Sequence, residues 1–374
     1  MRRSVFIILC LQGAVLFFNV AASAALIPSI AAEFAVSQFF LGTIVWIYML
    51  SYGTAALIYG PLMRAVDAKK IILICLFLFS CANFLAGISP NIKSLFAARF
   101  FMGAFGAAFI PVALILIARG TAPDRRGRYV GSFFGATFFA SLLGLFLSGI
   151  IPWRLIYLIP ASCGFILCLF VYFYLPHFNQ GKSQLRINYL PALRDRRVLA
   201  VFTYIFFISL LYHGVQQWLG VYFSKQYQLS QFIISMLIML TSLSGIFGEL
   251  LGGWFSDSLG RVKTIDLGIA LMILSVLLLI FNLPLLILYL LMVAWGLGWT
   301  FNHAGLSTLL TDLPKEFLNE SASLNSSVRF LAGGVGAFLG GVLLQRSFTL
   351  GFTVFGICLL LLLIFSKQLI IKKE

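Results

Sequence analysis

The chain has 374 residues, of which 61% are hydrophobic and 10% are charged, and its formal net charge at pH 7 is +15. A water-soluble domain carries about 25% charged residues, so this composition excludes a soluble protein. A positive balance alone could indicate nucleic-acid binding. Here the basic residues are spread over short segments between long apolar stretches. Membrane topology and anionic lipid headgroups therefore explain the charge, and we expect no nucleic-acid partner.

Twelve long apolar stretches follow one another along the sequence. About 20 apolar residues span a bilayer as a helix, and these stretches are too uniformly apolar for barrel strands. The first stretch follows Arg2 and Arg3 but is longer than the apolar core of a secretory signal, so we interpret it as a retained helix. The sequence therefore predicts an all-α membrane protein. The predicted spans are 4–30, 39–62, 70–88, 93–118, 128–151, 155–176, 199–223, 232–255, 264–282, 284–309, 323–345 and 348–367.

Lys and Arg are distributed unevenly between the two sides of the predicted bundle. With a cytoplasmic N-terminus, 20 of the 26 lie in cytoplasmic segments, 4 lie on the opposite side, and 2, Arg99 and Arg329, lie within helices. Cytoplasmic loops accumulate Lys and Arg. We therefore expect both termini to be cytoplasmic and the protein to be a multi-pass protein of the plasma membrane, the bacterial inner membrane. All six cysteines fall inside apolar spans without metal-ligand spacing, which predicts neither a disulfide framework nor a metal site.

The longest polar stretch, from His177 to Arg197, lies at the middle of the chain. It predicts a cytoplasmic linker, 177–198, between an N-terminal six-helix bundle, 1–176, and a C-terminal six-helix bundle, 199–374. Landmark residues recur in the two halves at separations of 191 to 193 residues, which predicts a duplicated six-helix unit. The matching pairs are Gly60 with Gly253, Gly103 with Gly296, Arg154 with Arg346, and Pro123 with Pro314.

The segment between the eighth and ninth spans carries the most specific motif. It reads Gly253-Trp-Phe-Ser-Asp257-Ser-Leu-Gly260-Arg261-Val-Lys263, which fits G-x-x-x-D-x-x-G-R-x-K. Gly253 allows close helix approach, Asp257 can cap a helix or pair with a cation, and Gly260 allows a tight turn. The motif resembles the cytoplasmic signature of the major facilitator superfamily. The resemblance implies that Gly253, Asp257, Gly260 and Arg261 form a gating loop, which latches the two halves in the outward-open state.

The first half carries an eroded copy of this motif. Gly60 is kept, Arg64 stands where the family has Asp, and Asp67 could substitute for that acid from a shifted position. Three other segments also resemble the family, and the stretch from Ile27-Pro28 through Gly60 is similar to the first hairpin of bacterial twelve-helix efflux proteins. The three segments are Arg99-Phe-Phe-Met-Gly103-Ala-Phe-Gly106-Ala-Ala, Trp153-Arg154, and Gly333-Gly334-Val-Gly336-Ala-Phe-Leu-Gly340-Gly341.

The resemblance implies the major facilitator fold, with twelve transmembrane helices in two pseudo-symmetric six-helix bundles. It also implies a monomeric transporter in a lipid bilayer that moves a small-molecule substrate by alternating access. Our leading hypothesis is proton-coupled efflux of a drug-like compound or metabolite, with the proton gradient as energy source and no cofactor. The main alternative is an importer of a siderophore or nutrient. The first span lacks an acid and the fifth lacks a Gly-Pro pair, which weakens the multidrug-antiporter interpretation.

A polytopic membrane enzyme is a remote alternative. It would require a converging histidine and acid or amide, and neither His213 nor His303 has such a partner in the sequence. The sequence also shows no ATP-binding loop and no soluble domain that could drive a primary pump. We therefore expect a protein that is not an enzyme.

Charged residues inside membrane helices are costly and mark functional sites. Glu249 is the only carboxylate well inside a predicted span, and Arg329 lies at similar depth. Glu249 could carry the coupling proton, or it could form a structural ion pair with Arg329. Arg99 lies near the outer end of the fourth span. The family pattern makes it a coupling or gating residue, and the alternative is an interfacial arginine that reaches outer headgroups.

In the resembled fold, the first, fourth, seventh and tenth helices line a central cavity. Asn19 and Ser23 share a face of the first span at spacing i, i+4. The sequence places Trp299, Asn302 and His303 on one predicted face of the tenth span. Such polar and aromatic groups suit a partly aromatic, polar or zwitterionic substrate, although a membrane histidine is often only an interhelical hydrogen-bonding group. The cavity candidates are Asn19, Ser23, His213, Gln216, Gln217, Trp218, Trp299, Asn302 and His303.

Overall fold

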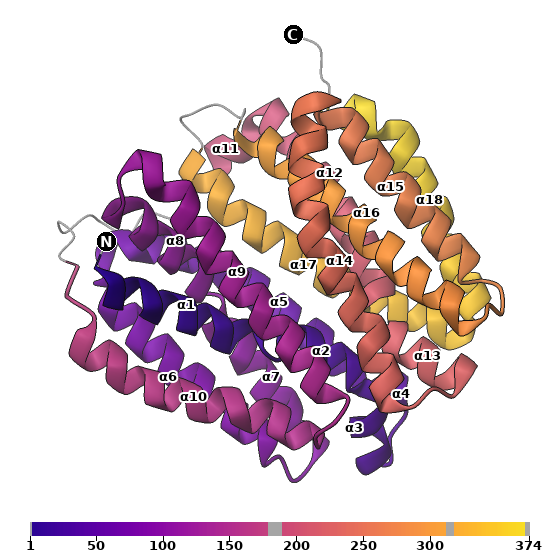
Figure 1. Ribbon diagram of the computed structural model, residues 1–374, viewed down its shortest axis with the longest axis horizontal. Helices are drawn as coiled ribbons and strands as arrows, with labels where there is room; N and C mark the ends of the chain where they lie inside the picture. The colour runs from indigo at the N-terminus through magenta and orange to yellow at the C-terminus, as the bar shows by residue number, and fades with distance from the viewer. Residues whose placement is uncertain (1, 179–188, 312–317, 371–374) are drawn as a thin grey trace. The chain divides into compact units, whose positions relative to one another are not determined.

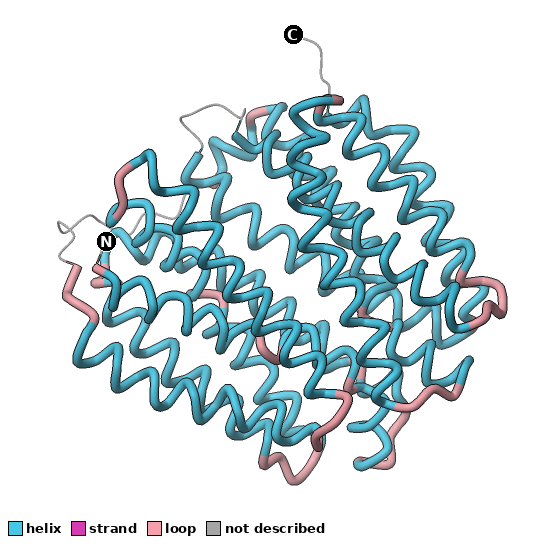
Figure 2. The backbone as a smooth tube through the Cα atoms, in the orientation of Figure 1, coloured by secondary structure: helices cyan, strands magenta, loops and turns pink. Residues whose placement is uncertain are grey.

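The computed structural model describes residues 2–178, 189–311 and 318–370. These residues form helices joined by turns and short loops, with no strand among them (Figures 1 and 2). Contacts between residues divide the chain into two compact units, Met1–Ile187 and Asn188–Glu374. Part of the predicted linker, 179–188 with Lys182 and Arg186, lies outside the described residues, as do Pro314, Lys315, Lys372 and Lys373.

Unit 1 contains ten helical segments in the described residues up to 178. Several predicted spans are formed by two consecutive segments, because the helix is interrupted within the span. The segments are α1 (Arg3–Phe17), α2 (Val20–Ala25), α3 (Ile27–Glu33), α4 (Gln38–Leu41), α5 (Thr43–Ala65), α6 (Ala68–Gly87), α7 (Ile92–Gly106), α8 (Phe109–Gly120), α9 (Pro123–Ser148) and α10 (Trp153–Tyr174).

Unit 2 begins, in the described residues, with a short helix that precedes its first long one. The segments are α11 (Leu190–Arg194), α12 (Arg196–Gln216), α13 (Leu219–Tyr227), α14 (Gln231–Ser258), α15 (Arg261–Leu278), α16 (Leu285–Thr311), α17 (Leu318–Arg346) and α18 (Phe348–Ile370). The short α11 lies in the region predicted as linker.

Eleven helical spans among the described residues are long and apolar enough to cross a membrane. Each coincides with one of the predicted spans. The remaining predicted span, 264–282, coincides with α15, whose 18 residues include Arg261, Lys263 and Asp266 near its start. These three charges within 18 residues set α15 apart from the eleven other spans. The prediction of an all-helical membrane protein is confirmed.

The first, fourth and seventh predicted spans are each interrupted along their length. The interruptions lie between α1 and α2, between α7 and α8, and between α12 and α13. Asn19 and Trp218 occupy two of these points with nearly identical backbone angles, φ −108° and ψ −3° for Asn19 and φ −108° and ψ −1° for Trp218. At the break between α12 and α13, the Trp218 amide donates to the Val215 carbonyl, three residues earlier, at 2.9 Å. This is a tighter turn than in an α-helix. The breaks are therefore local bends within continuous spans.

The internal repeat predicted from glycine spacing is visible in the contacts within each unit. In unit 1 the Cα of Gly103 packs so closely on α5 that a methyl group there would overlap the Tyr48 carbonyl and the Ser51 hydroxyl. In unit 2 a methyl group on Gly296 would overlap the corresponding groups of α14, the Thr241 carbonyl and the Ser244 hydroxyl. Close glycine contacts let helix backbones approach in membrane proteins. The same contact is therefore built twice, 193 residues apart.

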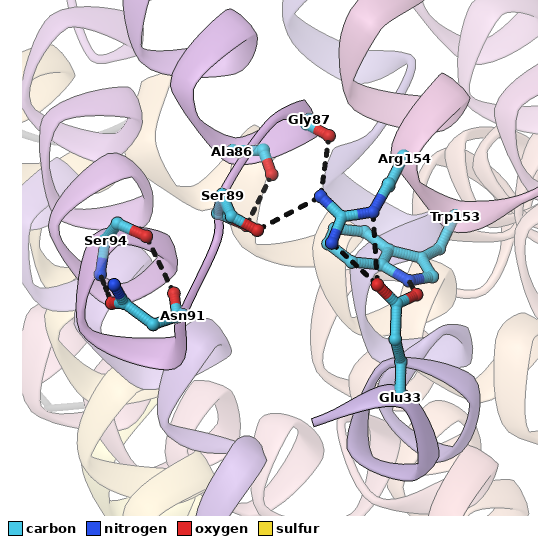
Figure 3. A network of polar contacts seen from close by, with 8 residues as sticks. All are labelled: Glu33, Ala86, Gly87, Ser89, Asn91, Ser94, Trp153 and Arg154. Carbon is cyan, nitrogen blue, oxygen red and sulfur yellow. Dashed lines mark hydrogen bonds and ion pairs between the residues drawn. The ribbon is translucent and has the colours of Figure 1, made fainter. Parts of the chain in front are cut away.

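A network of polar contacts ties three segments together at one end of unit 1 (Figure 3). Glu33, the last residue of α3, accepts hydrogen bonds from Trp153 Nε1 at 2.5 Å and from Arg154 Nη2 at 2.6 Å. Arg154 Nη1 also donates to the carbonyls of Gly87 at 3.0 Å and Ser89 at 3.1 Å. The guanidinium lies 4.6 Å from the Trp153 ring centroid. The Trp153-Arg154 pair thus connects the start of α10 to the ends of α3 and α6, and Glu33 is a partner that the sequence interpretation missed.

We expect this network to make stability depend on pH. Partial burial alone would raise the pKa of Glu33, but the hydrogen bonds from Trp153 and Arg154 and the Arg154 charge hold that pKa below its ordinary value of 4.5. The stabilisation is therefore full above the ordinary value and is lost as the pH falls through the lowered pKa. Thermal unfolding of Glu33→Gln should occur at a lower temperature than that of the wild type at pH 7. The difference should shrink in the acid range.

The matched control is Asp257→Asn, which removes an exposed carboxylate from unit 2. It should leave the acid dependence of unfolding as in the wild type. If the difference in unfolding temperature between Glu33→Gln and the wild type stays constant between pH 7 and pH 3, the ionised carboxylate does not stabilise this end of unit 1.

Candidate functional site

Close packing of α14 against α16 builds the first part of the site in unit 2. Gly245, Gly248 and Gly252 lie along one face of α14 at spacings of three and four residues, and each faces α16 within contact distance. A methyl group on Gly248 would overlap the Thr300 hydroxyl. Because small residues let the two backbones approach, side chains at the edge of this seam on α14 can reach side chains of α16.

Glu249 and His303 meet beside this seam. Glu249 Oε1 lies 2.5 Å from His303 Nδ1, and the two side chains are 30% and 36% exposed. When the imidazole is protonated, the two side chains form an ion pair. The sequence suggested Arg329 as the partner of Glu249, and that prediction is wrong for direct contact.

Arg329 lies in α17 beside the pair but is not bonded to it. Its Nε donates to Asn325 Oδ1, one turn earlier on the same helix, at 2.8 Å. The residue is 9% exposed, and both η nitrogens are buried without a hydrogen-bond partner among the described residues. Its charge interacts electrostatically with Glu249. Arg329 is therefore held in place through one nitrogen while its two remaining nitrogens stay available.

Aromatic side chains form the next layer. Trp299 of α16 stacks on Tyr212 of α12, with ring centroids 4.0 Å apart and planes at 11°. His213 meets the same Trp299 ring edge-on at 5.7 Å, and the Arg329 guanidinium lies 5.9 Å from its centroid. Gln217 Nε2 lies 3.0 Å from His213 Nδ1. Four candidates, His213, Gln217, Trp299 and His303, thus converge with Glu249 and Arg329, and Tyr212 was missed although it precedes His213 directly.

Asn302 does not belong to this group. Its Oδ1 accepts from the Tyr204 hydroxyl at 2.8 Å, and its Nδ2 donates to the Gly298 carbonyl at 3.1 Å. Residues four apart on a helix share a face, as Trp299 and His303 do, but adjacent residues are rotated by about 100°. The prediction of one face with Trp299, Asn302 and His303 is therefore wrong for Asn302, which is buried against α12 and α15.

Gln216 and Trp218 also point to other partners. The Gln216 side chain donates to Thr241 Oγ1 at 3.2 Å and accepts from Trp295 Nε1 at 2.7 Å, which links α12 to α14 and α16. Trp218 is buried against α17, where its Nε1 donates to the Ala337 carbonyl at 2.8 Å. Both residues join helices within unit 2 rather than the Glu249 cluster.

The unit 1 candidates Asn19 and Ser23 are fully buried. Asn19 Nδ2 donates to Asn83 Oδ1 of α6 at 2.5 Å. The Ser23 hydroxyl donates to the Asn19 carbonyl at 2.7 Å and lies 3.0 Å from the Tyr157 hydroxyl of α10. These bonds tie the bend between α1 and α2 to two neighbouring helices. A role in lining a cavity stays a prediction.

Arg99 of α7 is 1% exposed, inside unit 1. Its Nε donates to the Ile44 carbonyl at 3.0 Å, and its guanidinium lies 4.4 Å from the Tyr48 ring centroid and 5.9 Å from that of Tyr157. No carboxylate pairs with it among the described residues. The alternative that Arg99 reaches lipid headgroups is wrong, because the side chain is enclosed by α5 and α10.

The gating-loop motif of unit 2 joins α14 to α15. Gly260 has φ +93°, a region that side chains disfavour, so the motif glycine is required by the turn itself. Asp257 lies exposed in the last turn of α14, and Arg261 begins α15. Gly253 has no neighbouring atom within 4 Å of a built methyl group, so the expectation that it allows close helix approach is wrong for the described residues. The side chains of this loop are thus held at the surface of unit 2 by a turn that only glycine makes easily.

The eroded copy in unit 1 is organised differently. Gly60 lies within α5, whereas Asp67 caps α6 by accepting from the Lys69 amide at 3.1 Å. Asp67 also accepts from the Phe178 amide at 3.0 Å and lies 2.5 Å from His177 Nδ1. Partial burial alone would raise the pKa of Asp67, but the bonds from His177, Phe178 and Lys69 hold it below its ordinary value. Asp67 is thus bound to the segment that follows α10.

Comparisons with known proteins agree with this architecture. The sequence model of the Major Facilitator Superfamily matches residues 9–341. The MFS-type transporter YbcL of Bacillus subtilis (strain 168), itself uncharacterised, is 23% identical over 344 residues, which cover 89% of this chain and 87% of YbcL. Multidrug resistance protein 3 of the same organism is 28% identical over 142 residues, which cover 37% of this chain and 28% of that protein.

A solved structure shows the same fold. A bacterial homologue of the human lysosomal transporter Spinster, in an inward-facing and unoccupied conformation, superimposes with a TM-score of 0.79 at 13% identity. The match covers 99% of this chain and 97% of that chain. The predicted family is thereby confirmed together with the helical fold. The chain is a member of the major facilitator superfamily and, as such, a multi-pass membrane transporter of small molecules.

Proposed function

We propose that this transporter exports a small organic molecule, a drug-like compound or metabolite, in exchange for protons by alternating access. The contact between Glu249 and His303 carries the proposal. A carboxylate within a membrane-spanning helix is costly unless it is paired or protonated. Glu249 can be stabilised in either way, as the partner of a protonated His303 or as a neutral acid. A change of water access at this pair therefore changes how many protons it holds.

The direction of transport rests on resemblance. The partial likeness to Multidrug resistance protein 3 and the efflux-like first hairpin support export. Import of a siderophore or nutrient is the second candidate, favoured by the missing acid in the first span and the missing Gly-Pro pair in the fifth. Alternating access permits transport in either direction. The exporter would move its substrate against the flow of protons, whereas the importer would move it in the same direction as the protons.

The setting of the protein is part of the proposal. The concentration of Lys and Arg in alternate segments supports cytoplasmic termini and residence in the bacterial inner membrane. The exposed Asp257 and the partly buried Arg261, at a turn fixed by Gly260, support a gating contact for this loop. The protein then works as a monomer without a cofactor, and the proton gradient supplies the energy.

Transport in membrane vesicles tests the function directly. Inside-out vesicles that contain the wild-type protein receive an imposed pH gradient, acidic inside, and a diverse panel of compounds. We expect at least one compound to accumulate, and accumulation to stop when nigericin in potassium buffer dissipates the pH gradient. Vesicles without the protein are the control. Protein-dependent uptake that ignores the gradient would contradict proton coupling, and uptake only in right-side-out vesicles with the acidic side outside would favour the importer.

A further inference from the structure

Arg329 has no role in the proton-coupling proposal, although it is buried beside the Glu249–His303 pair. An arginine side chain keeps its charge in proteins and carries five N–H donors. In Arg329, the Nε donor is used by Asn325. Both η nitrogens are buried and lack a partner in the part of the chain that the structure describes. Buried donors are almost always satisfied, and buried cations are paired, so this guanidinium calls for an anion that the described residues do not provide.

Glu249 does not supply that anion, because its carboxylate contacts His303 instead. The two η nitrogens of a guanidinium lie in one plane and match the two oxygens of a carboxylate. The bond from Arg329 Nε to Asn325 restricts the rotation of that plane. The available donors therefore form a preorganised fork for a planar, two-oxygen anion.

The surroundings of the fork are aromatic. Trp299 lies 5.9 Å from the guanidinium carbon and stacks on Tyr212, and His213 meets its edge. Trp299, His213 and His303 are each partly exposed, so this aromatic group borders accessible space in unit 2. Flat apolar groups pack well on such rings, and binding sites combine an apolar wall with a few fixed polar groups.

We propose that Arg329 binds the carboxylate of the transported molecule, and that the substrates are organic acids with a flat, apolar body that packs on Trp299. This inference rests on the proposed transport function and narrows its substrate class. Glu249 and His303 lie next to the bound acid, so the protonation of their pair and the binding of a negative charge at Arg329 influence each other electrostatically.

Binding measured separately from transport tests the inference. The purified full-length protein in lipid nanodiscs is titrated by calorimetry with benzoate, naphthoate and indole acetate, and with the primary amide of each acid. We expect at least one acid to bind about 30-fold or more tightly than its amide. Arg329→Gln should remove this preference, and Arg329→Lys should reduce it, because an ammonium keeps the charge but loses the planar fork. The matched control is Arg346→Gln, an exposed arginine on the same helix, which should bind as the wild type does.

The outcomes separate the two proposals. If every amide binds the wild type as well as its acid, the inference is wrong, even where vesicles show gradient-driven transport of other compounds. A clear acid preference that depends on Arg329, in a protein whose vesicles show no gradient-driven uptake, supports this site and contradicts the transport mechanism. If Arg329→Gln does not fold, the acid-to-amide comparison on the wild type and on Arg329→Lys still decides.

Discussion

Vesicles containing Glu249→Gln are expected to lose all gradient-driven accumulation while the variant folds and inserts normally. The amide removes the titratable group but keeps the size of the side chain, whose Oε1 lies 2.5 Å from His303 Nδ1 in the wild type. Both side chains are about one-third exposed, so solvent limits the cost of losing the charge. Substrate exchange without a gradient should continue, because exchange requires no net proton movement.

Two comparisons make this result specific. Glu33→Gln also removes a carboxylate but lies in the unit 1 network, and it should keep gradient dependence even if its unfolding temperature is lower. His303→Gln should resemble Glu249→Gln in uncoupling transport. Gradient-driven accumulation that survives in Glu249→Gln would assign the pair a structural role and end the coupling hypothesis. Loss of folded Glu249→Gln protein, restored by adding Arg329→Gln, would instead show that the two charges depend on each other for folding.

Replacement of Gly296 by alanine is expected to eliminate most folded protein. The added methyl group overlaps the Thr241 carbonyl and the Ser244 hydroxyl, and a backbone carbonyl cannot move without displacing α14. Overpacking of this kind costs about 1–3 kcal/mol or more, a large part of the marginal stability of a folded protein. Gly103→Ala should have the same effect in unit 1, where the methyl group meets the Tyr48 carbonyl. The monodisperse fraction in fluorescence-detected size-exclusion chromatography measures both effects.

Gly135 provides the matched control for these substitutions. It lies within α9, and a built methyl group there has no neighbouring atom within 4 Å. Alanine is favoured over glycine in a helix by about 0.5–1 kcal/mol, so Gly135→Ala should fold at least as well as the wild type. Equal yields from Gly135→Ala and Gly296→Ala would refute the importance of the repeated contact.

The sequence was sufficient for the spans, the repeat and the family, because these depend on apolar length, on glycine spacing and on the motif from Gly253 to Lys263. The spacing that paired Gly103 with Gly296 predicted a duplicated unit, and the two glycines make the same contact in each unit. The partner of Glu249 could not be predicted in the same way. It depends on the rotation of α14 and α16 about their axes, and several polar side chains lie at similar depth. The row of glycines on α14 indicates that another helix packs closely there. It does not identify which residue of that helix contacts Glu249.

Helix rotation also explains the error at Asn302. Sequence spacing fixes the direction of a side chain around a helix only within a wide angle. The bonds to Tyr204 and Gly298 turn the Asn302 side chain away from Trp299. Glu33 was missed for another reason: it lies outside the long apolar spans, and its partners Trp153 and Arg154 are more than 100 residues away. Contacts of that kind follow from the assembled bundle rather than from any local pattern.

The buried position of Arg99 has a consequence for how the chain enters the membrane during synthesis. An arginine within an inserting membrane helix is costly, which opposes release of α7 alone into lipid. The carbonyl of Ile44 and the ring of Tyr48, which surround Arg99 in the finished protein, belong to α5 and have already been synthesised when α7 emerges. We therefore expect α7 to pack against α5 as it enters the bilayer, because these contacts lower the cost of placing Arg99 in the membrane.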